Sequence, residues 1–292
     1  MTLKQTWRLL KEAFQEWQQD KASRLAAALA YYTVFSLAPL LILVIAIAGS
    51  IFGTESARDQ LTGQIQGLVG PSGAEVVTSA LENASQPGAN QGAIASTVSI
   101  ALLIFGASGV FVQLQDSLNT IWNVEPKPGQ GIGYFIQKRL LSFSMILVIG
   151  FLLLVSLVVS TALAALSGFL DHWLAGLSWL INFAISISLV TLLFAAIFKY
   201  LPDAKIRWKD VIVGALITAL LFNLGKYLLG LYLGNSSFAS TYGAAGSLVV
   251  LLAWIYYSAQ ILFFGAEFTQ VYARRFGSRI VPDKHAVVSS NK

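Results

Sequence analysis

The sequence predicts an all-α polytopic membrane protein with six transmembrane helices and an N-terminal interfacial amphipathic helix. Hydrophobic residues make up 56% of the 292 positions and charged residues only 11%, against about 25% charged in soluble domains. Six apolar stretches approach or exceed the ~20 residues that a helix needs to cross a hydrocarbon core ~30 Å thick. They run over 25–52, 91–113, 140–166, 176–198, 211–232 and 246–272.

Basic residues lie almost entirely on one side of these predicted spans. Lys and Arg occur before the first span, in the loops after the second and fourth spans, and after the sixth, whereas the outer loops hold only Arg58. This positive-inside pattern, with an even number of crossings, places both termini in the cytoplasm. We therefore attribute the pI near 9.4 to topology and expect no nucleic-acid partner. The expected partners are the lipid bilayer and the anionic headgroups of its cytoplasmic side.

The chain divides into three parts: a cytoplasmic amphipathic segment (1–24), a six-helix transmembrane domain (25–272) and a cytoplasmic polar tail (273–292). In the first part, apolar residues recur at helical spacing and form one narrow stripe: Leu3, Trp7, Leu10, Phe14 and Trp17. This stripe favours a helix lying in the membrane interface, or one packed against the cytoplasmic ends of the bundle, and the sequence leaves both open.

The first span carries Pro39, which lacks an N–H and clashes with the carbonyl one turn earlier, so a kink near Phe35 is expected. Tyr32 and Ser36 lie one turn apart and are available to the freed backbone groups. The long outer loop at about 53–90 predicts two short helices, the second starting after Pro71. We interpret this loop as a folded connector; the alternative is a lid or docking surface.

The later spans carry scattered polar residues, and each is a candidate for lining a cavity. With residues of the first span, the cavity-lining candidates are Tyr32, Ser36, Pro39, Asn182, Asn223, Lys226, Tyr227, Gln260 and Glu267. Polar side chains within a membrane segment are expensive, and ionisable ones are functional candidates by default. The alternatives are that Lys226 snorkels to the outer face and that Glu267 forms an ion pair at the interface, near Arg274, Arg275 or Arg24.

The two larger cytoplasmic loops hold residues that we interpret as structural. These are Asp116, Trp122, Asn123, Pro202, Asp203, Trp208 and Asp210. Pro202 is expected to stop the fourth helix and Asp210 to cap the fifth. The residues around Asp116, Asn119 and Trp122 are a candidate partner surface for Asp203, and both tryptophans suit an aromatic belt.

Motifs for catalysis are missing from the sequence. His172 and His285 have no partners at metal-ligand spacing, and the chain contains no cysteine. We find no phosphate-cradling glycine loop and no nucleophile elbow. We therefore predict no catalytic residue, no metal site, no cofactor and no enzymatic activity.

Several runs of the sequence resemble the YihY/virulence factor BrkB family of bacterial inner-membrane proteins. The runs are residues 21–40 (KASRLAAALAYYTVFSLAPL), Ile121-Trp122-Asn123, Leu201-Pro202-Asp203 with Trp208 and Asp210, Tyr242-Gly243, Trp254 with Tyr256, and Gly265-Ala266-Glu267. The resemblance implies a multi-pass protein of the bacterial inner membrane with both termini cytoplasmic. Members have also carried the name ribonuclease BN.

Three functions remain open from the sequence. The first is a transporter or lipid-handling protein with a polar intramembrane cavity, which requires the polar candidates to converge. The second is a non-transporting scaffold or envelope-integrity factor. The third is a ribonuclease, for which the residues offer no cluster for metal-assisted cleavage. Small residues on helix faces serve dimer contacts and internal packing alike, so a homo-oligomer is also left open.

Overall fold

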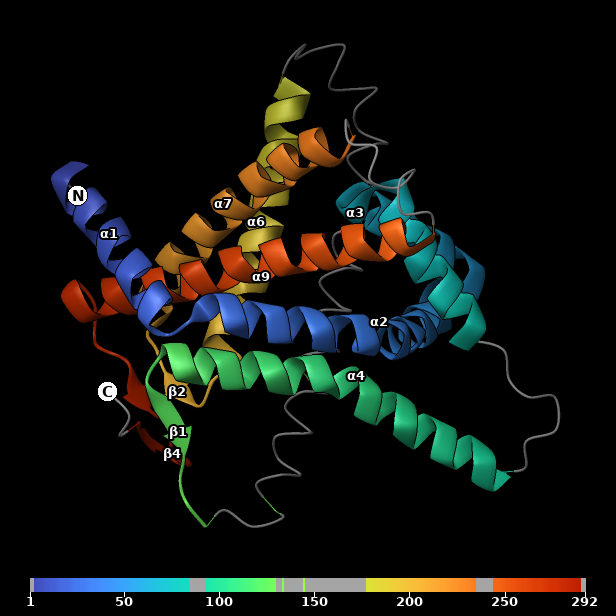
Figure 1. The fold of residues 1–292 in the computed structure, drawn as a ribbon, viewed down its shortest axis with the longest axis horizontal. Helices are drawn as coiled ribbons and strands as arrows, with labels where there is room; N and C mark the ends of the chain where they lie inside the picture. Colours follow the sequence, from blue (N-terminus) through green and yellow to red (C-terminus); the bar gives the residue numbers. More distant parts are fainter. Residues whose placement is uncertain are drawn as a thin grey trace.

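The computed structural model describes residues 3–84, 93–129, 177–234 and 244–289, together with residues 133 and 144. The helices of the described ranges are α1 (Leu3–Gln19), α2 (Ala22–Phe52), α3 (Thr54–Ala84), α4 (Ala93–Ile121), α6 (Leu177–Tyr200), α7 (Trp208–Gly234) and α9 (Ala244–Arg275) (Figure 1). Among the described residues, four segments are long and apolar enough to cross a membrane: Ala22–Ser50, Phe183–Tyr200, Trp208–Leu229 and Gly246–Arg275. They coincide with the first, fourth, fifth and sixth predicted spans, whereas the span predicted over 140–166 lies outside the described residues.

α4 is longer than the sequence pattern predicts. The apolar stretch ends near residue 113, but the helix continues to Ile121. Its last two turns carry Gln115, Ser117 and Asn119, and all three side chains are buried. The helix continues because these polar groups pack inside the protein rather than facing water, which an apolar-length criterion cannot detect.

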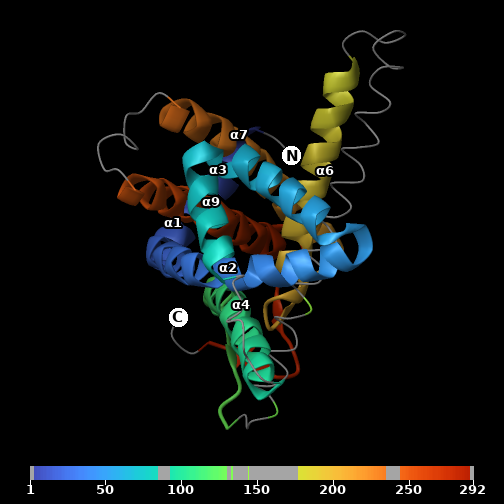
Figure 2. The ribbon, with the colours of Figure 1, turned by 90° about the vertical axis from the view of Figure 1, so that its right-hand side faces the viewer.

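α2 continues through Pro39 as one helix and bends along its length (Figures 1 and 2). It packs against α4 through two glycines. A Cβ on Gly106 would lie 3.2 Å from Cγ of Pro39, and one on Gly109 would lie 3.2 Å from Oγ of Ser36. These glycines therefore allow the two helices to approach closely around the proline.

α7 and α9 cross through a reciprocal pair of Gly-x-x-x-Thr segments. Thr218 Oγ1 donates a 2.7 Å hydrogen bond to the carbonyl of Gly214, and Thr269 Oγ1 donates a 2.7 Å bond to that of Gly265. A Cβ added to Gly214 would collide with Thr269, and one added to Gly265 would collide with Thr218. Each glycine thus makes room for the threonine of the opposite helix.

α3 consists of two helical segments joined at Gly70, whose φ of 77° and ψ of 175° are not helical, followed by Pro71 (Figure 2). This agrees with the two helices predicted in the outer loop. Val77 and Leu81 of the second segment are buried in a cluster with Leu41 of α2 and Leu251 of α9. The segment therefore packs onto the bundle, as a folded connector does.

The segment after α9 is not a separate polar tail, and the all-α prediction needs a small correction. Strand β1 (Val124–Pro126) pairs antiparallel with β4 (Ala286–Val288), and β2 (Ala204–Lys205) pairs with β3 (Val281–Pro282). The returning segment thus ties together the loops that follow α4 and α6. Ala286 is buried and Ile280 packs against the core, whereas Val281 and Val288 are exposed, so the strand pairing and these two contacts hold the segment in place.

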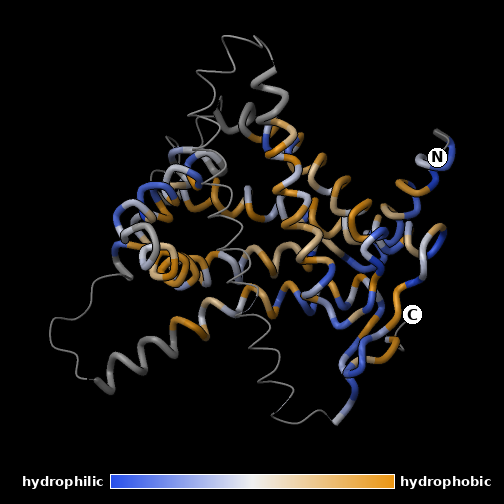
Figure 3. Tube along the Cα trace, turned by 180° about the vertical axis from the view of Figure 1, so that it is seen from behind, coloured by the Kyte–Doolittle hydropathy of each residue, from blue (hydrophilic) through white to orange (hydrophobic). Residues whose placement is uncertain are grey.

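The strands and α1 lie at the same end of the molecule (Figure 1). Hydrophilic residues gather at this end, whereas the helices between it and α3 are mainly hydrophobic (Figure 3). The largest core cluster joins α4, α6, α7 and α9 near this end and includes Leu118, Trp122, Phe198 and Phe263. The rings of Trp122 and Phe198 meet edge to face with centroids 5.9 Å apart.

Candidate functional site

The cavity-lining candidates do not converge on one cavity among the described residues. Tyr32 and Tyr227 are 44% and 66% exposed on the outside of the bundle, and Lys226 is exposed too. Ser36 is buried, and Pro39 beside it packs against α4. The expected common polar cavity is therefore not observed in this part of the chain.

The remaining candidates occupy separate environments. Asn223 donates a 2.9 Å hydrogen bond to the carbonyl of Ala219 on its own helix. Glu267 is fully buried on α9, while Arg274 and Arg275, two of its three expected partners, form ion pairs with α1. Gln260 lines a groove at the surface of α9. The side chain of Asn182 lies outside the described residues, as does His172.

Asp203 connects the loop after α6 to α4, whose Gln115 and Asn119 provide side-chain partners. Its Oδ1 accepts a 3.0 Å bond from Nε2 of Gln115, and its Oδ2 accepts a 2.8 Å bond from Nδ2 of Asn119. Its backbone N–H donates to Oδ1 of Asn119 at 2.8 Å, and its carbonyl accepts from the N–H of Asp283 at 2.9 Å. Asn119 belongs to the partner surface predicted for Asp203, whereas Gln115 is a partner that the sequence did not predict.

Trp122 is 3% exposed and donates from Nε1 to the carbonyl of Ala266 at 3.1 Å, so it belongs to the core and not to an aromatic belt.

Trp208 is 44% exposed and packs edge to face against Tyr200, with the Nζ of Lys199 5.8 Å from its ring. This cation–π arrangement suits a membrane boundary. Pro202, two residues beyond the end of α6, is buried.

Asp210 lies in the first turn of α7, within the helix, and not at the capping position before it. Its Oδ2 accepts 3.3 Å hydrogen bonds from the backbone N–H and the hydroxyl of Ser278. A side chain at Gly277 would collide with the same carboxylate. Asp210 therefore anchors the segment that leaves α9.

The two remaining loop candidates are Asp116 and Asn123. Asp116 is exposed, and Asn123 adopts a left-handed backbone with a φ of 54°.

Ion pairs between α1 and the end of α9 hold α1 in place. Arg274 Nη2 lies 2.6 Å from Oε1 of Glu12 and 2.9 Å from Oε1 of Glu16, and Arg275 also pairs with Glu12. Burial acts to raise the pKa of Glu12, but the hydrogen bonds from Arg275 and Arg274 outweigh it and lower that pKa below its ordinary value. Beneath these charges, Leu9 and Ala13 bury against α9.

Next to this contact lies a groove of about 270 Å³ between α1, α7 and α9. Its lining includes Phe14 and Trp17 of α1, Leu221 and Leu224 of α7, and Gln260 and Phe264 of α9. Two buried polar atoms in this lining, Nε1 of Trp17 and Oε1 of Gln260, have no hydrogen-bond partner within the described ranges. The side chains that line this otherwise apolar groove thus include one buried donor and one buried acceptor without partners in the described residues.

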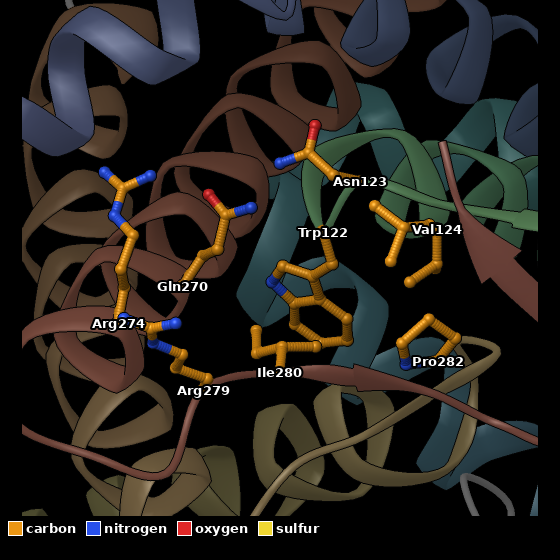
Figure 4. A pocket seen from close by; sticks show the side chains of 9 residues that line it. Trp122, Asn123, Val124, Gln270, Arg274, Arg279, Ile280 and Pro282 are labelled. Atoms are coloured by element: carbon orange, nitrogen blue, oxygen red, sulfur yellow. The ribbon is translucent and has the colours of Figure 1, made fainter. Parts of the chain in front are cut away.

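A second cavity, of about 410 Å³, lies beside the last turns of α9, among the strands (Figure 4). Trp122 and Ile280 contribute its apolar part, and Asn123, Gln270 and Arg279 contribute polar groups. It shares no lining residue with the groove. In the described part of the chain, no three His, Asp or Glu side chains form a group that would hold a metal ion.

Comparison with known proteins places the chain among membrane proteins. A family model described as Virulence factor BrkB matches residues 13–289. A UPF0761 membrane protein of Psychrobacter sp. (strain PRwf-1) is 28% identical over 93% of this chain and 49% of its own length. One from Teredinibacter turnerae is 29% identical over 92% and 61%, and one from Pseudoalteromonas translucida is 28% identical over 86% and 81%. This chain thus spans about half to three fifths of the first two relatives. No solved structure matches it.

Proposed function

We propose that this chain, which belongs to the virulence factor BrkB family, is a lipid-handling membrane protein that holds a lipid in the groove between α1, α7 and α9. The relatives are named only as membrane proteins, so the proposal depends on the site. The observation that carries it is the pair of buried atoms without partners, Trp17 Nε1 and Gln260 Oε1, in an apolar groove. Buried polar groups in proteins are ordinarily satisfied, so these two favour a bound amphiphile.

The depth of Gln260 distinguishes this groove from ordinary lipid contact. The apolar segment of α9 runs Gly246–Arg275, and Gln260 lies near its middle. At about 1.5 Å per residue, Gln260 is about 20 Å along the helix from Arg274. A polar group at that depth is expensive unless it serves a ligand or a partner. We infer that it receives a donor group of a lipid drawn below the usual headgroup level.

The groove is also reachable from the lipid phase. Leu224 of α7 lines it and is 56% exposed, and Leu220 and Leu228, one turn to either side, are 47% and 52% exposed. This apolar face of α7 suits contact with acyl chains. An ester carbonyl of the lipid would accept from Trp17, while its chains would lie against Leu221 and Leu224.

The topology is part of the proposal. We infer six spans, an inner-membrane location and cytoplasmic termini from the charge distribution, with the first turns of α1 at the membrane boundary. The exposed ring of Trp7 supports this placement. Epitope tags at the two ends of the chain should be inaccessible in intact cells and become accessible after permeabilisation. Labelling of either tag in intact cells would contradict this topology.

Lipid retention tests the groove directly. The purified protein should keep a bound lipid in native mass spectrometry after detergent exchange. Gln260→Met removes the amide at nearly constant shape, and Trp17→Phe removes the indole N–H together with part of the ring, so each should weaken retention at least three- to tenfold. Trp7→Phe, at the 70% exposed ring of the same helix, is the matched control and should retain lipid normally. Equal retention in all three variants would refute the proposal.

A further inference from the structure

The cavity beside the last turns of α9 is lined by two arginines, as an anion site would be (Figure 4). Arg279 lines it, and within the described ranges its side chain forms no ion pair. Arg274 also lines it but is held by Glu12 and Glu16 of α1. None of the lining residues is acidic. Because a guanidinium matches phosphate oxygens in geometry and charge, the cavity favours an oxyanion.

A buried amide in the same cavity indicates a second feature of the ligand. Gln270 is only 7% exposed, and its Oε1 is buried without a hydrogen-bond partner in the described part of the chain. Its amide lies between Arg274 and Asn123, above the ring of Trp122 (Figure 4). An acceptor in this position requires a donor, which an oxyanion lacks but a hydroxyl group supplies.

The backbone around the cavity is held in an uncommon conformation. Only three non-glycine residues among those described have positive φ, and two of them, Asn123 and Arg279, line this cavity, each with a φ of 54°. Such conformations cost energy and concentrate at sites where a side chain must be aimed at a ligand. They set two polar side chains at the rim of the cavity from segments far apart in the sequence.

We infer that this cavity binds a phosphate ester that also carries a free hydroxyl group. Arg279 receives the phosphate oxygens, Gln270 accepts from the hydroxyl, and Trp122 with Ile280 covers the carbon skeleton. The volume of about 410 Å³ falls within the range of small-molecule sites. Both a phosphoglycerol lipid headgroup and a soluble polyol phosphate present this chemistry.

The test uses glycerol 3-phosphate and methyl phosphate as soluble probes, with full-length protein in detergent and isothermal titration as the readout. Wild type should bind glycerol 3-phosphate about three- to tenfold more tightly than methyl phosphate, which has no hydroxyl. Gln270→Met should abolish this preference without abolishing phosphate binding. Arg279→Asn, which tolerates the left-handed backbone, should weaken binding of both probes at least tenfold. Arg207→Asn removes an exposed arginine elsewhere at this end and is the matched control.

A second arm identifies the source of the ligand. The protein is placed in nanodiscs of phosphatidylglycerol and phosphatidylcholine, and the retained lipids are identified by native mass spectrometry. Selective retention of phosphatidylglycerol that Arg279→Asn abolishes assigns the site to a lipid headgroup. Binding of glycerol 3-phosphate without such retention assigns it to a soluble ester. Absence of both, or equal behaviour of Arg279→Asn and Arg207→Asn, overturns the inference. Groove variants at Trp17 should leave these results unchanged.

Discussion

The crossing of α7 and α9 provides the sharpest test of the packing. A methyl group at Gly214 would collide with the side chain of Thr269, which is itself fixed by its hydrogen bond to Gly265. Overpacking of this kind costs about 1–3 kcal/mol, which exceeds the ~1 kcal/mol that alanine gains over glycine in helix propensity. We therefore expect Gly214→Ala to lower the free energy of unfolding.

The assay is reversible unfolding in mixed micelles, with two comparisons built in. Gly63→Ala, at a helical glycine of α3 with nothing within 4 Å of the added Cβ, should be neutral or stabilising. Adding Thr269→Ala to Gly214→Ala should recover part of the loss, because it removes the atoms that clash. If Gly214→Ala behaves like Gly63→Ala, or if the second substitution gives no recovery, the described crossing is wrong.

Two further predictions concern the end of the molecule that carries the strands. Asp203→Ala should destabilise the protein by about 2–4 kcal/mol, because it leaves the buried amides of Gln115 and Asn119 without an acceptor. Asp59→Ala, at an exposed aspartate of α3, is the control and should change the stability by less than about 0.5 kcal/mol. Thermal unfolding compares the two variants, and equal effects would contradict the network. The second prediction concerns pH. Because the pKa of Glu12 is lowered in the folded protein, its ion pairs stabilise the packing of α1 fully at pH values above the ordinary pKa. This stabilisation is lost as the pH falls through the lowered pKa. Hydrogen exchange of α1, corrected for intrinsic rates, should report this loss, and protection that stays constant through acidification would refute it.

Segment length and composition were sufficient to predict four of the six spans, because twenty apolar residues in a row have few alternatives to a membrane helix. The break at Gly70-Pro71 was also predictable from the local sequence, because both residues disfavour a continuing helix. The extension of α4 was not predictable in this way, because Gln115 and Asn119 look like loop residues until Asp203 is placed beside them.

The candidate site was harder to predict, because periodicity shows which residues share a face and not where the face points. Tyr32 and Tyr227 were selected for their polarity, yet both are exposed on the outside. The pairing of Glu12 with Arg274 joins residues 262 positions apart, and no local pattern encodes it. One signal was available and was missed: the repeated Gly-x-x-x-Thr spacing at Gly214 and Gly265 marks the crossing of α7 and α9.

The central claim, that the groove between α1, α7 and α9 holds a lipid, is tested most directly by photo-crosslinking. A benzophenone amino acid replaces Phe264 in the groove, Phe105 on the exposed outer face, or Phe263 in the core. We predict lipid adducts at Phe264 that persist when crosslinking follows detergent exchange, adducts at Phe105 that disappear on exchange, and none at Phe263. Adducts at Phe264 that disappear together with those at Phe105 would show that the groove holds only bulk lipid, and would contradict the account.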